Sequence, residues 1–156
     1  MKIKALFLGV AHLLLCSFAI ANVTVYRATD RKNATYAKVA DGQWRIDEDG
    51  LSTFELANFN VTNKACQITF VIQNVTSQPD PGTRGQVQNM AAGYIGVYTP
   101  EHGGVGHWSI QPPHGTSNAA FQAAVTAYVI AHGATGVNAN YTGSNPSLCQ
   151  TPAAAN

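Results

Sequence analysis

Hydrophobic and polar side chains alternate along several short stretches of the chain, as expected for half-buried β-strands. Residues 23–27 alternate and are rich in β-branched and aromatic side chains, which predicts an opening strand. Residues 66–75 form an apolar run that suits a central strand of a sheet. Two more strands are predicted at residues 94–98 and 107–110, on either side of a glycine-rich connection that we expect to be a hairpin or a functional loop.

Near the C-terminus the hydrophobic positions recur at helical spacing instead. Ser117 is a good N-cap and Gly133 a good terminator, so we predict a helix over residues 118–132. Its apolar face consists of Phe121, Val125, Tyr128 and Val129. This helix is expected to pack on the sheet.

The remaining segments carry weaker signals. Residues 29–50 are polar with turn signals, and Ser52 or Thr53 is expected to cap a short helix over residues 54–59. A last short strand is expected at residues 137–141. The pattern as a whole predicts an α+β domain, with a mainly antiparallel sheet and one principal C-terminal helix.

The first 21 residues have the pattern of a secretory signal peptide. A basic start at residues 1–4 precedes an apolar run at residues 5–18 and a small-x-small cleavage signal, Ala19-Ile20-Ala21. The apolar run is shorter than the roughly 20 residues that a membrane-spanning helix needs. We therefore predict a secreted or periplasmic protein with one domain, residues 22–156, and no membrane association after signal removal.

Charge and cysteine content refine this picture. Only 11% of the residues are charged, and the basic side chains of the mature chain are scattered from Arg27 to Arg84, which argues against binding to a nucleic-acid backbone. Signal removal leaves Cys66 and Cys149 of the three cysteines. One disulfide bond between them is predicted in an oxidising compartment, and the alternative is two buried free thiols.

Residues 101–108 and His114 hold the densest group of polar side chains, with three histidines and Glu101. Imidazole and carboxylate groups are common zinc ligands, but their spacing here matches no recognised metal motif, so we predict no metal site. The stretch Gly50-Leu51-Ser52-Thr53-Phe54 lacks the second glycine of the G-x-S-x-G element of serine hydrolases. A metal-dependent hydrolase therefore ranks third among the functional interpretations.

The order of three short motifs is more specific than any one of them. Val25-Tyr26-Arg27 ends the first strand, Asp49-Gly50-Leu51-Ser52-Thr53-Phe54 follows a polar loop, and Gly106-His107-Trp108-Ser109-Ile110-Gln111-Pro112 precedes the helix. This order resembles small secreted bacterial toxins of the ADP-ribosyltransferase-like superfamily, particularly compact type VI effector toxins. The resemblance implies an ADP-ribosyltransferase-like fold, NAD as a substrate, a macromolecular acceptor and an immunity protein as a further partner.

The resemblance also implies roles for individual side chains. Arg27 would bind the NAD pyrophosphate, because its planar charge suits bidentate phosphate contacts. Ser52 and Thr53 would donate to the nicotinamide ribose or carboxamide. His107 would position the ribose or transfer a proton. Residues expected to stack on a ring are Phe54, Tyr26 or Trp108.

In these toxins a glutamate stabilises the ribosyl cation that forms when nicotinamide leaves. Glu101 is the nearest candidate, although the chain has no (Q/E)-x-E motif. Activity as an ADP-ribosyltransferase or NAD glycohydrolase is the first hypothesis. The alternative is a non-catalytic secreted binding domain that presents the Gly/His loop to a protein partner. Convergence of Arg27, Ser52 or Thr53, and His107 in space would favour the enzyme.

Overall fold

The computed structural model describes residues 20–30, 49–55, 64–133 and 135–136. The loop expected up to residue 48, most of the helix expected at 54–59 and the strand expected at 137–141 lie outside these residues. So does Cys149, and the expected disulfide bond therefore stays a prediction.

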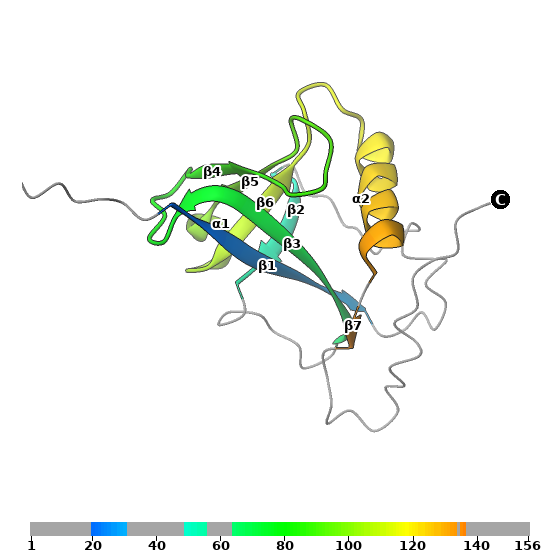
Figure 1. Cartoon of the computed structure of the whole chain (residues 1–156), viewed down its shortest axis with the longest axis horizontal. Coiled ribbons are helices and arrows are strands. Elements are labelled where there is room, and N and C mark those ends of the chain that lie inside the picture. The colour runs from blue at the N-terminus through cyan, green and yellow to red at the C-terminus, as the bar shows by residue number, and fades with distance from the viewer. Residues whose placement is uncertain (1–19, 31–48, 56–63, 134, 137–156) are drawn as a thin grey trace, which may run out of the picture.

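Within the described residues, seven strands form one sheet in the order β4-β5-β6-β2-β1-β3-β7, and every pair of neighbours is antiparallel. The strands are β1 (Ile20–Asp30), β2 (Leu51–Phe54), β3 (Lys64–Thr76), β4 (Arg84–Gln86), β5 (Ile95–Tyr98), β6 (His107–Gln111) and β7 (Thr135–Gly136). Figure 1 shows the long β1 and β3 crossing the molecule as a twisted pair.

The sheet curls until it nearly closes into a barrel. Ile72 of β3 forms an isolated antiparallel bridge with Val87, which directly follows the edge strand β4. The Gln88 backbone N–H also donates to the Val71 carbonyl at 2.8 Å. These contacts join β3 to the β4 edge and so enclose a single core.

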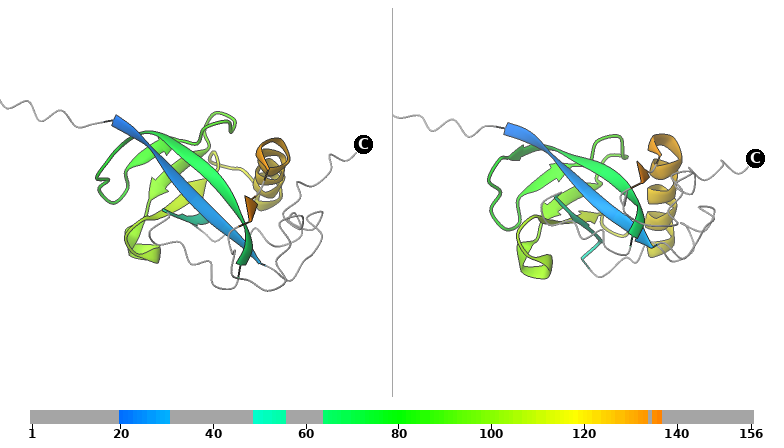
Figure 2. Two further views of the ribbon diagram at one scale, coloured as in Figure 1. Left: turned by 60° about the horizontal axis from the view of Figure 1, so that its bottom comes forward. Right: turned by 90° about the horizontal axis from the view of Figure 1, so that it is seen from below.

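The core is filled by alternate residues of the strands and by one face of α2 (Asn118–His132). Trp108 and Phe70 are the largest fully buried side chains. The Tyr128 ring of α2 stacks on Phe70 with 4.8 Å between ring centroids, and its hydroxyl donates to the Thr69 carbonyl. Figure 2 shows α2 standing beside the curled sheet.

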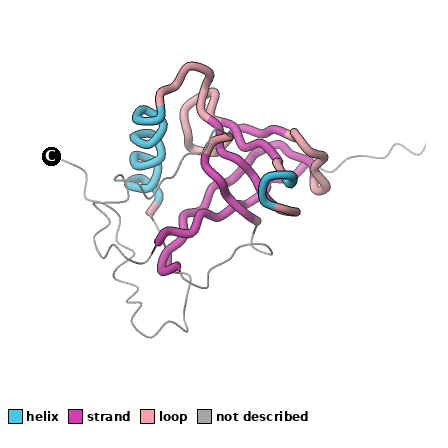
Figure 3. The backbone as a smooth tube through the Cα atoms, turned by 180° about the vertical axis from the view of Figure 1, so that it is seen from behind, coloured by secondary structure: helices cyan, strands magenta, loops and turns pink. Residues whose placement is uncertain are grey.

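The short helix α1 (Pro100–Gly103) is a single turn between β5 and β6. Figure 3 shows α1 and α2 on opposite sides of the molecule. The glycine-rich connection is therefore a hairpin connection that contains a helical turn. Among the described residues, no helix combines the length and the apolar character needed to cross a membrane.

The strands predicted at residues 23–27, 66–75, 94–98 and 107–110 are confirmed as β1, β3, β5 and β6, with small differences at their ends. The predicted helix is confirmed from its first residue to its last, together with its buried apolar face. The α+β architecture, with a mainly antiparallel sheet and one principal helix, is confirmed as well.

One local prediction is wrong. Ser52 and Thr53 do not cap a helix, because Leu51–Phe54 is strand β2 between β1 and β6. Leu51 and Thr53 are fully buried while Ser52 and Phe54 are only partly buried, which is the alternation of a strand. Pairing with β6 over four residues overrides the capping preference of the two hydroxyl side chains.

Strand β1 begins at Ile20, two residues before the predicted mature N-terminus. Ile20 and Ala21 pair with Thr76 and Val75 of β3, and Ile20 is 73% exposed. Cleavage after Ala21 would thus shorten the outer end of β1 and keep its pairing from Val23 onward.

Candidate functional site

Ser52 and His107 form the centre of the candidate site. They lie on the adjacent strands β2 and β6, whose register pairs Ser52 with Ser109 and Phe54 with His107. Ser52 and His107 are therefore diagonal neighbours on one face of the sheet. The Ser52 Oγ lies 2.7 Å from the His107 Nε2, a short hydrogen bond between two side chains.

Thr99 binds the other nitrogen of the imidazole ring. The His107 Nδ1 lies 3.0 Å from the Thr99 carbonyl oxygen and 2.9 Å from the Thr99 Oγ1. A carbonyl oxygen only accepts hydrogen bonds, so the contact with the Thr99 carbonyl favours the tautomer in which Nδ1 carries the proton and donates to it. The Nε2 then holds a lone pair and accepts the hydrogen bond from the Ser52 hydroxyl.

The surroundings of His107 keep its ring neutral. Burial lowers the pKa of His107 below its usual 6.5, and the electrostatic influence of His102 and Arg27 acts in the same direction. The hydrogen bond to the Thr99 backbone and the charge of Glu101 oppose this decrease without cancelling it. His107 is therefore a neutral base at physiological pH.

The His107 ring is also held firmly in place. Only 4% of the residue is exposed, and the Phe54 ring packs edge-on against the imidazole with 4.8 Å between centroids. The Thr99 Oγ1 also lies 3.0 Å from the Ser109 Oγ, which ties the end of β5 to β6. These contacts restrict the orientation of the imidazole.

Arg27 of β1 lies on the core face of the sheet, because it pairs with Ile68 whereas its neighbour Tyr26 pairs with Phe54. Its Nη1 donates to the Ser52 carbonyl oxygen at 2.9 Å. Because the strand order is β6-β2-β1, β2 lies between the strands that carry His107 and Arg27. The Ser52 hydroxyl and the His107 imidazole thus form one side-chain cluster, and the Arg27 guanidinium contacts it through the Ser52 main chain.

The other predicted site residues lie at different distances from this cluster. Phe54 belongs to it through its ring contact with His107. Glu101 lies on α1 with its side chain 54% exposed, and its Oε1 is 3.9 Å from the His102 Nε2. Its charge acts on His107, although no hydrogen bond links the two.

Thr53 and Trp108 lie in the core and are not brought together with the cluster. Both are fully buried, and the Thr53 Oγ1 donates to the Trp108 carbonyl at 2.8 Å. The Trp108 Nε1 donates to the Glu55 Oε1 at 3.0 Å. Thr53 and Trp108 therefore support the site from the core side of β2 and β6.

Thr99 is the component that the sequence did not reveal. It lies between β5 and α1 and is nearly buried. The sequence signal is a threonine that precedes Pro100 at the end of a predicted strand, a combination with no specific chemical meaning. Only the pairing of β5 with β6 places Thr99 next to His107.

The histidine-rich loop does not assemble a metal site in the described part of the chain. No group of three or more histidine, cysteine, aspartate or glutamate side chains is placed there to hold a metal ion. The His102 Nδ1 pairs instead with the Asp49 Oδ2 at 3.0 Å, and both side chains are largely exposed. His107 points to Ser52 and Thr99, and His114 is exposed.

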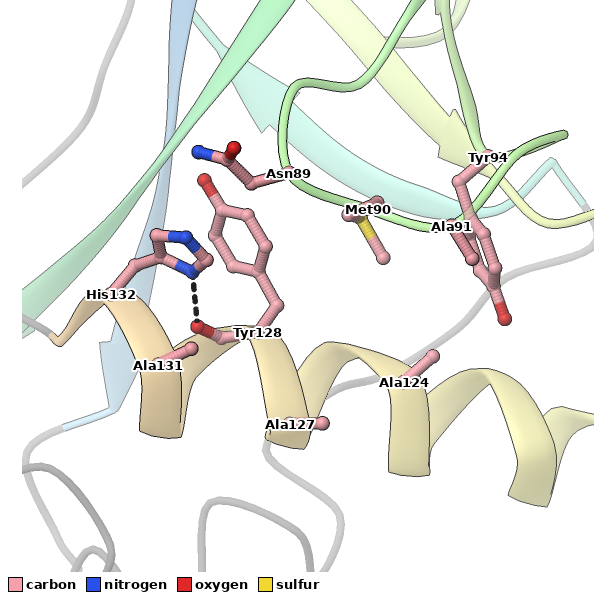
Figure 4. Close-up of a pocket in the computed structure, with 9 residues that line it drawn as sticks. All are labelled: Asn89, Met90, Ala91, Tyr94, Ala124, Ala127, Tyr128, Ala131 and His132. Atoms are coloured by element: carbon pink, nitrogen blue, oxygen red, sulfur yellow. Dashed lines mark hydrogen bonds between the residues drawn. The ribbon is translucent and has the colours of Figure 1, made fainter.

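A pocket of about 310 Å³ lies elsewhere, between α2 and the turn that leads into β5 (Figure 4). Its walls are mostly apolar and include Met90, Tyr94 and Tyr128. The His132 ring at its end stacks on Tyr128 with 4.3 Å between centroids. Arg27, Ser52 and His107 do not line this pocket.

Comparison of the chain with known protein families, curated proteins and solved structures finds no match. The functional interpretation therefore depends on the chemistry of the cluster and on the resemblance of its motifs.

Proposed function

We propose that this protein is an exported, toxin-like enzyme of the ADP-ribosyltransferase type that acts on NAD and a macromolecular acceptor. The observation that carries the proposal is the hydrogen bond between the Ser52 hydroxyl and the His107 imidazole, with Arg27 bound to the main chain of the same serine. These residues come from the three motifs whose order resembles that of secreted ADP-ribosyltransferase toxins. The antiparallel sheet with one principal helix is compatible with such a fold.

Each group in the cluster has a property that the reaction requires. Arg27 supplies a permanent positive charge for the pyrophosphate of NAD. The Ser52 hydroxyl and the Phe54 ring offer a polar and an aromatic contact to the nicotinamide ribose. Glu101, on the exposed α1 turn, is the carboxylate nearest in sequence to His107 and supplies the negative charge that a ribosyl cation needs.

The reaction begins when the bond between nicotinamide and the ribose C1 breaks, and the electron pair leaves with nicotinamide. An acceptor hydroxyl or water then attacks C1, and its proton passes to the His107 Nε2. The neutral ring and its Nδ1–H bond to Thr99 suit His107 to this role as a base. Attack by a macromolecule gives transfer, whereas attack by water gives NAD hydrolysis.

The test is release of nicotinamide from NAD by the purified mature chain. Arg27→Ala and His107→Ala should each reduce the rate by about 100-fold or more. Arg84→Ala, at an exposed position of β4, and His132→Ala, at the pocket beside α2, are matched controls that should retain the parental rate. Equal release by all five proteins would contradict the proposed roles.

A binding function is the second candidate, and one observation favours it. The connection between β5 and β6 projects into solvent, and Val105 is 75% exposed although it is apolar. An exposed loop of this kind suits contact with a protein partner, such as an acceptor or an immunity protein. Partner binding that is lost in Val105→Asp, without any nicotinamide release by the parent, would favour this function.

A further inference from the structure

The cluster also has the arrangement of a serine nucleophile with its base. We propose that Ser52 attacks carboxylic esters as a nucleophile, with His107 as its general base and the Thr99 carbonyl as the group that orients the base. This activity goes beyond the proposed action on NAD and does not depend on it.

The geometry comes from three neighbouring strands. Ser52 lies on β2, His107 on β6, and Thr99 directly after β5. The Ser52 Oγ to His107 Nε2 distance is 2.7 Å, and the His107 Nδ1 to Thr99 O distance is 3.0 Å. A nucleophile in hydrogen-bond contact with a base, and a third group that orients the base, is the general signature of an activated hydroxyl.

The protons are placed for catalysis. If Nδ1 carried no proton, its lone pair would face the lone pairs of the Thr99 carbonyl at 3.0 Å. The Nδ1–H form avoids this repulsion and leaves Nε2 as the basic nitrogen. The Ser52 hydroxyl proton then points at the atom that must receive it. This arrangement exists before any substrate binds.

Access to the cluster favours reaction at the serine. His107 is 4% exposed and is covered by Phe54, whereas Ser52 is only partly buried. Ser52 is therefore the more exposed residue of the pair. Ser52 lies inside a strand instead of on a glycine elbow, which explains why its sequence context gave only a weak signal.

Arg27 provides the nearby positive charge. Its Nη1 lies 2.9 Å from the Ser52 carbonyl oxygen, and its charge lowers the pKa of His107. Its positive charge therefore contributes to the electrostatics of the Ser52–His107 pair.

The proposed reaction is balanced with water as the second substrate. The Ser52 Oγ forms a bond to the acyl carbon while its proton moves to the His107 Nε2. The bond from carbon to the leaving oxygen breaks, and the leaving alkoxide takes that proton from His107. Water then attacks the acyl-serine with His107 again as the base, which releases the carboxylic acid and restores the Ser52 hydroxyl.

A hydrogen bond between a serine and a histidine can also be purely structural, and chemical reactivity separates the two cases. The parent protein is treated with a fluorophosphonate probe in the absence of NAD, and the modified residue is found by peptide mapping. Ser117 is an internal control, because it is exposed but its hydroxyl only accepts from the Ala120 N–H. We expect one adduct, on Ser52, and none on Ser117.

Variants test the base and its protonation. Ser52→Ala should abolish labelling, and His107→Gln should slow it by about 100-fold or more. The labelling rate of the parent should rise with pH as His107 loses its proton. With p-nitrophenyl acetate, the parent should release a burst of p-nitrophenol equal to the amount of enzyme, and Ser52→Ala should release none.

Three results would overturn the proposal: no adduct on Ser52, equal labelling of Ser117, or unchanged labelling in His107→Gln. The first two use only the parent, so misfolding of a variant does not affect them. The experiments contain no NAD, so a failure of nicotinamide release would leave this inference standing. Absence of labelling would equally leave the NAD proposal intact.

Discussion

The Ser52 Oγ and the His107 Nε2 are 2.7 Å apart although the two residues are separated by 55 positions in the chain. The distance follows from the register of β2 and β6, in which Phe54 lies opposite His107 and Ser52 opposite Ser109. Two motifs that look independent in the sequence are therefore parts of one site. Any change in this register would separate the hydroxyl from the imidazole.

The lowered pKa of His107 makes the protein less stable in mild acid. Between the pKa of His107 in the folded chain and its usual 6.5, the unfolded chain binds a proton that the folded chain does not. The free energy of unfolding should therefore fall as the pH decreases below about 6.5, until the folded-state pKa is reached. Urea denaturation between about pH 5 and pH 8 measures this dependence.

His107→Gln removes this titrating group and should flatten the dependence in that range. The groups that influence His107 besides the Thr99 backbone are His102, Glu101 and Arg27, and all three remain in the variant. His132→Gln is the matched control, because it also removes an imidazole but lies at the pocket beside α2. If the free energy of unfolding of both variants kept the parental dependence on pH, the burial of His107 would not be the cause of that dependence.

Gly103 sets how closely α1 approaches the imidazole. A Cβ at this position would clash with the Cδ2 of His107 and lie 2.6 Å from its Cγ. Gly103→Ala should displace the ring, lengthen its hydrogen bond to Ser52 and cost about 1–3 kcal/mol of stability. NMR shifts of the His107 ring and the labelling rate of Ser52 measure the displacement.

Gly104→Ala is the paired control for this prediction. Gly104 has a φ of 87°, but no atom lies within 4 Å of a Cβ placed there. Alanine should therefore strain the backbone, at a cost of about 1–3 kcal/mol, without contact to His107. Identical ring shifts in the two variants would mean that movement of the loop, and not the clash, affects the site.

Segments with strong local signals were predictable from the sequence. The Ser117 Oγ accepts from the Ala120 N–H at 3.2 Å, and Gly133, with a φ of 78°, donates its N–H to the Val129 carbonyl at 2.7 Å. Both ends of α2 are thus determined by residues within one turn of the boundary. Interactions between residues close in sequence were sufficient to place both ends of α2.

Segments that depend on distant partners were not predictable in this way. Ser52 and Thr53 are as suitable for a helix cap as for a strand, and their pairing with β6 makes them a strand. Strand β4 (Arg84–Gln86) has no hydrophobic alternation, and its pairing with β5 alone defines it. Likewise, the sequence singled out Arg27, Ser52 and His107, but Thr99 becomes significant only through the register of β5 and β6.

A Thr53 variant distinguishes structural support from substrate contact, because Thr53 faces the core whereas its neighbour Ser52 lies on the exposed side of β2. Thr53→Val removes the buried hydrogen bond to the Trp108 carbonyl at nearly constant volume and should cost about 1–3 kcal/mol. Nicotinamide release and Ser52 labelling should stay at the parental rate at a temperature where the variant is folded. Loss of nicotinamide release with unchanged stability would instead assign Thr53 a direct contact with NAD.

Thr99 offers the last test, because its carbonyl and its hydroxyl both contact the His107 Nδ1. Thr99→Val removes the hydroxyl and its bond to Ser109 but keeps the carbonyl. If the carbonyl determines the tautomer, the proton should remain on Nδ1, and only stability should fall, by about 1 kcal/mol. Nitrogen-15 NMR of the imidazole reads the tautomer directly, and urea denaturation gives the stability. A proton that moves to Nε2 in Thr99→Val would show that the hydroxyl orients the base, and it would also slow the labelling of Ser52.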